Sequence, residues 1–190
     1  MQELFLDIET SGTDPIKHSI LSIGMVVSLN GLVDYQSFYK EIKYEELLIN
    51  PSAIEVNGFD FTSQAGRIPL LQTDEEAVSF IKRYYKPDIK PIPIGLNIAG
   101  FDMQFIHRHM PLLSNRLRRK TVELNSLIYI LAEKHSKDFK ELKYRLVKEA
   151  DERTTVLALG VEKHNALYDA VFNMNLYFMI KRDLLNQEET

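Results

Sequence analysis

One apolar run that ends in two acids, residues 4–10 (LFLDIET), constrains the fold of this chain more than any other stretch. The run leads directly into the turn-forming pair Ser11–Gly12, which predicts a β-strand. Successive side chains of a strand point to opposite faces, so Asp7 and Glu9 share a face with Phe5. The other face carries only apolar side chains, those of Leu4, Leu6 and Ile8. The sequence therefore predicts an inner strand that carries two neighbouring carboxylates.

Two carboxylates this close are costly to bury, and the usual remedies are a raised pKa or a bound cation. Oxygen ligands suit a hard divalent ion such as Mg²⁺ or Mn²⁺. Taken alone, the spacing of Asp7 and Glu9 favours an edge strand whose acids face water. Other parts of the chain must decide between a metal site and a solvated edge.

The composition is that of one ordinary globular domain without thiol chemistry. The chain has 190 residues, of which 45% are hydrophobic and 26% charged, and it has no cysteine, so disulfides and thiolate zinc sites are excluded. We expect a single domain over residues 1–185 and a polar tail at 186–190. No apolar run approaches the roughly 20 residues that span a bilayer, and a strand from about residue 3 leaves no room for a secretory leader, so we expect a cytoplasmic protein.

The net charge of −4 argues against a protein that coats nucleic acid through its overall field. It does not exclude a nuclease, because a bound metal ion reverses the local charge where carboxylates cluster.

Three early strands and a later alternation of helices and strands predict a mixed α/β sheet. Further strands are expected at 19–27 and 32–42, joined through a hairpin at Asn30–Gly31, and then at 92–96 and 121–124. Thr73 and Glu76 fit a capping box for a helix that ends near residue 85. Other helices are expected at 101–109, 126–135, 137–149 and 165–185. The last of these places Leu167, Val171, Met174 and Phe178 on one core-facing stripe.

Residues 44–67 form an irregular segment, with short helical turns expected at 45–48 and 51–56. A loop of this length in a compact domain is more often functional than idle.

Further acids lie at positions where a site is expected. Asp102 stands at the junction of a buried strand and a helix, where ligand sites of α/β proteins tend to lie, although the helix dipole alone would also favour an acid there. His164 precedes Asp169 by five residues, and on a continuous helix the two would point in directions about 140° apart. They converge only if His164 lies in the loop before the helix.

Taken together, these stretches resemble the DEDDh family of 3′–5′ exonucleases. The resemblance rests on residues 7–12 (DIETSG), 97–102 (NIAGFD) and 164–170 (HNALYDA), which occur in the family's order and at its distances over nearly the whole chain. Residues 53–58 (AIEVNG) are a weaker match to the family, at the place where its members carry a substrate-contacting helix and turn. No ligand or base position of the family is missing.

The resemblance implies an α/β protein of ribonuclease H-like fold, with a mixed five-stranded sheet flanked by helices. It also implies a two-metal site that holds two divalent cations, Mg²⁺ or Mn²⁺. Asp7 would bridge the two ions, Glu9 and Asp169 would hold the ion that carries the attacking water, and Asp102 would support the other. His164 would take a proton from that water, and the product would be a nucleoside 5′-monophosphate.

Substrate contacts are expected from residues near these acids. Thr10, Ser11 and Gly12 would hold the 3′-OH and sugar of the terminal nucleotide, and Asn57 would contact that sugar. Phe59 would stack on a base, or else pack in the core. Phe101 would line the site or serve only in packing. A basic run of Arg116, Arg118, Arg119 and Lys120 would track phosphates or form a solvated loop.

The resulting prediction is an exonuclease that acts on DNA or RNA, alone, as a homodimer or with a polymerase, and with no membrane partner. Two alternatives remain open from the sequence. One is a noncatalytic nucleic-acid or polymerase-binding module, and the other is an endonuclease or phosphohydrolase that uses the same metals.

Overall fold

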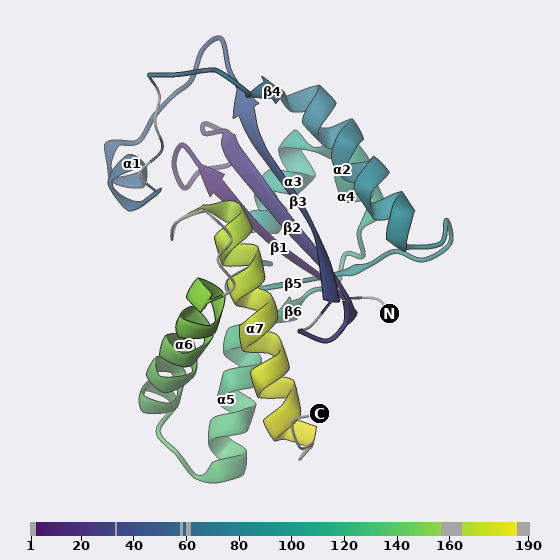
Figure 1. The fold of residues 1–190 in the computed structure, drawn as a ribbon. Helices are drawn as coiled ribbons and strands as arrows, with labels where there is room; N and C mark the ends of the chain where they lie inside the picture. Colours follow the sequence, from purple (N-terminus) through teal and green to yellow (C-terminus); the bar gives the residue numbers. More distant parts are fainter. Residues whose placement is uncertain (1–2, 33, 58, 60–61, 157–164, 186–190) are drawn as a thin grey trace.

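A mixed sheet of six strands in the order β4-β3-β2-β1-β5-β6 forms the centre of the molecule (Figure 1). The structure, a computed structural model, describes residues 3–32, 34–57, 59, 62–156 and 165–185. The predicted α/β class is confirmed, but the predicted count of five strands is wrong. The additional strand is β4 (Ile68–Pro69), which pairs with β3 over two residues only and therefore leaves no alternating pattern in the sequence.

The first three strands form an antiparallel meander, and the predicted hairpin joins the second strand to the third. They are β1 (Glu3–Thr10), β2 (Ile20–Asn30) and β3 (Asp34–Lys43). The turn between β2 and β3 contains Gly31, whose φ of 64° lies in the left-handed region that favours glycine. Two short strands, β5 (Ile92–Gly95) and β6 (Val122–Glu123), extend the sheet in parallel beyond β1.

Helices cover both faces of the sheet (Figure 1). On one face lie α2 (Leu70–Tyr84), α3 (Asp102–His109) and α4 (Pro111–Arg116). On the other lie α5 (Leu124–His135), α6 (Phe139–Val156) and α7 (Ala166–Leu185). A short helix, α1 (Pro51–Asn57), stands apart from both layers, in the predicted irregular segment. None of the described helices combines the length and the apolarity needed to cross a membrane.

Strand β1 is the inner strand that the sequence predicts. It lies between β2 and β5, so an edge position with acids in open solvent is excluded. Leu4, Leu6 and Ile8 pack in the core beneath α2 and α3, whereas Phe5 packs in the core beneath α7. Alternate side chains of β1 therefore pack in the cores on the two faces of the sheet. Asp7 and Glu9 lie on the face that α7 covers, toward the end of the strand.

Several helix boundaries differ from the predictions. The proposed capping box is wrong, because α2 begins at Leu70, and the hydroxyl of Thr73 donates to the carbonyl of Pro69 inside the first turn, at 3.1 Å. Residues 45–48 are not helical. In α7, Val171 and Met174 are fully buried as predicted, but buried residues occur on most sides of this helix, which lies against the sheet and against α5 and α6.

Candidate active site

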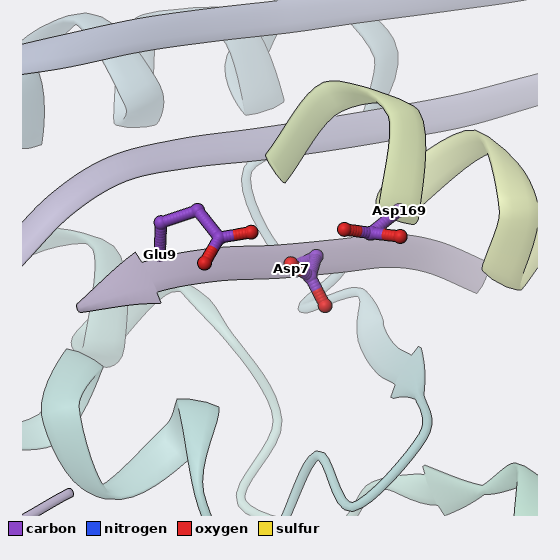
Figure 2. A group of neighbouring side chains, drawn as sticks. All are labelled: Asp7, Glu9 and Asp169. Carbon is purple, nitrogen blue, oxygen red and sulfur yellow. The ribbon is translucent and has the colours of Figure 1, made fainter. Parts of the chain in front are cut away.

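Three of the predicted carboxylates meet where β1 passes beneath the start of α7. Asp7 and Glu9 come from alternate positions of β1, and Asp169 comes from the first turn of α7 (Figure 2). Each offers a carboxylate oxygen, and these oxygens all lie within 4.8 Å of one another. All three residues are partly buried, so the cluster is neither sealed in the core nor spread over the surface.

The close approach of α7 depends on a glycine opposite Asp7. Gly24 of β2 pairs with Asp7 in the antiparallel register. A Cβ atom on Gly24 would lie only 2.0 Å from the backbone carbonyl oxygen of Ala166, the first residue of α7. Because Gly24 has no side chain, the start of α7 can pack closely against the sheet, which brings Asp169 near Asp7.

Asn165 fixes the start of α7 through its side chain. Its Oδ1 atom accepts a hydrogen bond from the backbone N–H of Leu167 at 3.0 Å, as in an N-terminal cap. Its Nδ2 atom donates to the hydroxyl of Tyr39 on β3, at 2.9 Å. The first turn of α7 is thus tied both to itself and to the sheet.

Asp102 reaches the same strand from the opposite layer. It is the first residue of α3, it is only 3% exposed, and its Oδ1 atom accepts the backbone N–H of Ile8 at 3.1 Å. Ile8 lies between Asp7 and Glu9, so this hydrogen bond fixes Asp102 beside both acids.

The turn before α3 has the tight geometry that this placement needs. Asn97 has a φ of 56°, and a Cβ atom on Gly100 would lie 2.6 Å from the Oδ1 atom of Asn97. The backbone N–H of Asn97 donates to Glu123 at 2.8 Å. Glu123 itself is a further acid close enough to raise the pKa of Asp102.

Burial and mutual repulsion make these carboxyls hard to ionise. Burial raises the pKa of Glu9 from 4.5 to about 8, and the charges of Asp169 and Asp102 add to the rise. Burial also raises the pKa of Asp102 to about 8, although the hydrogen bond from Ile8 opposes that rise. The pKa of Asp7 is raised well above its ordinary value, again by burial first and then by Asp102, Asp169 and Glu9.

Such a donor set fits divalent cations. Among the described ion pairs, none joins a lysine or arginine to Asp7, Glu9 or Asp102. Carboxylate oxygens are the ligands that Mg²⁺ and Mn²⁺ prefer, and positive charge at this point would offset the cost of ionising the cluster.

A cavity of about 330 Å³ opens directly beside the acids. Its lining includes Glu9 and three residues predicted to contact substrate, Thr10, Gly12 and Phe101. Ala53, the first residue of the 53–58 match to the family, also lines it, whereas the sequence did not single out Ile8, Thr13, Asn50 and Ser52 as substrate contacts. The long irregular segment indicated the region, but its contact with the turn after β1 depends on a backbone hydrogen bond, from Asn50 to Ser11 at 2.7 Å, which leaves no mark in the sequence.

The turn after β1 is rigidly built. Ser11 is fully buried and does not line the cavity; its Oγ atom accepts the backbone N–H of Ser19 at 3.0 Å. Gly12 leaves room for the ring of His18, which a Cβ atom would approach to 2.4 Å. Ser11 therefore shapes the turn, while Thr10 and Gly12 present it to the cavity.

Three further residues were predicted to take part: Phe59, Asn57 and His164. Phe59 packs against a cation, with the guanidinium carbon of Arg67 4.2 Å from its ring centroid. Asn57 is the last residue of α1. His164 lies outside the described residues, as do Gly58, from the weaker family match at 53–58, and the tail at 186–190.

The fold and the acids together define a class. An α/β protein with a mixed sheet flanked by helices, with clustered acids from β1 and α7, with Asp102 of α3 hydrogen-bonded to β1 and with a cavity that Glu9 lines, is consistent with the ribonuclease H-like exonuclease fold.

Sequence comparison points to the same class. No protein-family model matches the chain. The chain is 26% identical over 188 residues to a 3′-5′ DNA exonuclease, Cap18 of Escherichia coli, which covers 95% of this chain and 93% of the relative. It is also 26% identical over 133 residues to an oligoribonuclease of Vibrio vulnificus (strain CMCP6), over 65% of this chain and 71% of the relative. These relatives support the predicted membership of the DEDDh-type 3′–5′ exonuclease family.

Proposed function

We propose that this chain is a metal-dependent 3′–5′ exonuclease that hydrolyses the terminal phosphodiester of DNA or RNA and releases nucleoside 5′-monophosphates. The observation that carries the proposal is the convergence of Asp7, Glu9 and Asp169 within 4.8 Å, beside the cavity that Thr10, Gly12 and Phe101 line. The names of the relatives support it, since one is a DNA exonuclease and the other an oligoribonuclease.

In this proposal the acids hold two divalent cations, Mg²⁺ or Mn²⁺, and residues 1–185 act as one domain. Asp7 clusters with Glu9 and Asp169 and is near enough to Asp102 for that charge to raise its pKa, so Asp7 would serve both ions, Glu9 and Asp169 would hold one, and Asp102 would support the other. When bound, the two cations stabilise the attacking and leaving oxygens of an in-line displacement at phosphorus.

The chain's own residues supply orientation and proton transfer. The cavity beside Glu9 receives the terminal nucleotide, and the rigid turn from Thr10 to Gly12 presents hydroxyl and backbone groups to its sugar. His164 acts as general base for the attacking water. Imidazole has an ordinary pKa near 6.5, so a neutral base is available at physiological pH. In the sequence, His164 directly precedes Asn165, the residue that caps α7, and comes five residues before Asp169.

The test is a product time course on 5′-labelled DNA and RNA oligonucleotides of matched sequence, single-stranded and paired. We expect stepwise loss of single nucleotides in Mg²⁺ or Mn²⁺, and no loss in the presence of a chelator. A circular single strand should remain intact, because an exonuclease needs an end. Cutting of the circle would instead indicate an endonuclease, and tight binding without any cleavage would indicate a noncatalytic binding module.

Variants assign the roles. Asp7→Asn and Asp169→Asn should abolish turnover, whereas His164→Gln should lower kcat by at least about a hundredfold while metal binding persists. Asp34→Asn, a matched change at an exposed acid at the start of β3, is the control and should keep full activity. Full activity in the His164→Gln protein would refute its role as the base.

A further inference from the structure

A strongly basic surface lies at the end of the sheet away from the acids. It consists of two segments, residues 82–91 and 116–120, that lie side by side. They contain eight of the chain's 23 lysines and arginines and a single acid, Asp88. The basic members are Lys82, Arg83, Lys86, Lys90, Arg116, Arg118, Arg119 and Lys120, and all but Arg116 are exposed.

The structure fixes these two segments together through main-chain carbonyls. Arg116 donates from its two terminal nitrogens to the carbonyls of Pro87 and Lys86, both at 2.7 Å. Arg118 donates from Nε to the carbonyl of Lys90 at 3.2 Å, and from its backbone N–H to that of Pro91 at 2.9 Å. Residues 82–91 and 116–120, which we call the basic ridge, are therefore held together, and Arg116 and Arg118 donate to main-chain carbonyls.

The charge of this ridge contrasts with that of the rest of the molecule. The two segments carry a net charge of +7, so the remaining residues carry −11 within a chain of net charge −4. Among the ion pairs of the described residues, none involves the eight basic side chains. Beside the ridge, a groove of about 400 Å³ between α2 and α4 has a mixed lining of Glu75, Val78, Ser79, Lys82, Leu112, Asn115 and Arg116. A strongly positive surface on an acidic molecule suits a polyanion.

The position of the ridge suits a strand whose end lies in the active site. Pro91 precedes β5, whose Ile92 pairs with Glu3 in parallel, so the ridge lies level with the start of β1 while Asp7 and Glu9 lie toward its end (Figure 1). Four to six strand residues separate the two levels, which corresponds to about 13–20 Å. At about 3.4 Å per nucleotide, the spacing along one strand of stacked B-form DNA, roughly four to six nucleotides bridge that distance.

We propose that this basic ridge binds the phosphates of a nucleic-acid strand about five or more nucleotides from the 3′ end that lies in the active site. The proposal rests on the proposed exonuclease function for its choice of ligand. It makes the enzyme sensitive to substrate length, because a dinucleotide cannot reach the ridge.

The test compares two triple variants of equal composition. Lys90→Gln, Arg119→Gln and Lys120→Gln remove three exposed charges from the ridge. The control, which removes Lys137, Lys140 and Arg145 in the same way, takes three exposed charges from α6 and the loop before it, on the other face of the sheet.

Binding of a labelled 20-nucleotide single strand is followed by fluorescence anisotropy in EDTA, at salt concentrations from about 50 to 300 mM. Each phosphate contact contributes about −0.7 to the slope of log K against log salt for single strands. The ridge variant should therefore reduce the slope by about 2 and weaken binding at least about tenfold at the lowest salt. The control should keep the slope of the unmodified protein. An unchanged slope in the ridge variant, or an equal loss in the control, would overturn the proposal.

Cleavage gives an independent readout. The ratio of kcat/KM for the 20-nucleotide strand to kcat/KM for a dinucleotide should fall at least about tenfold in the ridge variant and stay unchanged in the control. Failure of the unmodified protein to cleave any substrate would refute the proposed function, and the binding measurement in EDTA would still decide for or against the ridge.

Discussion

Replacing Glu9 with Gln should stabilise the metal-free protein, by an amount that grows with pH. Glu9 points into the acidic cluster, where burial first, and then the charges of Asp169 and Asp102, raise its pKa from 4.5 to about 8. A pKa that is higher in the folded state than in the unfolded chain means that stability is greatest at low pH, where both states are protonated. Stability then falls as the pH rises from 4.5 toward 8.

The size of the effect follows from the same shift. Each tenfold change in an equilibrium constant corresponds to about 1.4 kcal/mol, so full ionisation of Glu9 above pH 8 costs on the order of 5 kcal/mol of folding free energy. At pH 7 the folded protein still holds most of this proton, and the cost is about 3 kcal/mol. Glutamine has nearly the same shape and no charge, so the variant avoids the cost.

The assay is urea denaturation in EDTA, at pH values from 4.5 to 8.5, of the unmodified protein, Glu9→Gln and the control Glu133→Gln. Glu133 is exposed on α5, far from the cluster along the chain. We expect the Glu9 variant to match the unmodified protein near pH 4.5 and to exceed it by about 3 kcal/mol at pH 7, or about 6–12 °C in Tm for a chain of this size. The control should differ little at any pH.

In saturating Mn²⁺ the unmodified protein should be more stable than Glu9→Gln, the reverse of the order expected in EDTA. The cation favours the ionised cluster, so it should stabilise the unmodified protein more than the variant, which lacks one ligand. A difference between Glu9→Gln and the unmodified protein that stays constant from pH 4.5 to 8.5 in EDTA would refute the argument, because it would show that the carboxyl ionises as freely in the folded protein as in the unfolded chain.

Three further predictions follow from the same geometry. Metal binding at pH 7 should release protons from the buried carboxyls, including Asp102, so the apparent affinity for Mn²⁺ in calorimetry should rise with pH between 6 and 8; a flat profile would contradict the raised pKa values. Gly24→Ala should push the carbonyl of Ala166 away, cost about 1–3 kcal/mol of stability and lower kcat more than tenfold, whereas normal activity would show that α7 has room to spare. His109→Ala should raise KM more than it lowers kcat, because the Nε2 atom of His109 is hydrogen-bonded to the carbonyl of Pro15 at 2.9 Å and so holds the loop that follows the cavity wall; an equal fall in kcat would contradict a purely positioning role.

The parts of the site that could be predicted from the sequence are those fixed by local geometry. Alternation along β1 alone places Asp7 and Glu9 on one face, and the structure has them there. Asp169 was expected in the first turns of a helix and lies in the first turn of α7. The directions in which successive side chains point are set by the backbone geometry of a strand or helix, and contacts with other segments do not alter them.

Other features depend on contacts between distant segments and left no local pattern. Strand β4 has two residues and exists only because Ile68 and Pro69 lie beside the end of β3. The apparent capping box failed because residues 70–72, which precede Thr73, are held in the helix, and the Thr73 hydroxyl then bonds to Pro69 within it. Asn50 reached the cavity lining through a backbone hydrogen bond to Ser11, which any residue other than proline could make.

Gly24 shows how a local sequence can conceal a long-range requirement. A glycine inside a strand such as β2 weakens it, and the sequence alone does not indicate why a glycine is needed at this position. In the structure it pairs with Asp7 and leaves space for the carbonyl of Ala166, so the same missing Cβ lets α7 approach the sheet near both Asp7 and Asp169. The approach also concentrates negative charge, because Asp169 raises the pKa of Asp7 only as a near neighbour. The cluster's cost in stability and its capacity to hold cations therefore have one structural cause, and a substitution at Gly24 that moves α7 away should both relieve the repulsion and weaken the metal site.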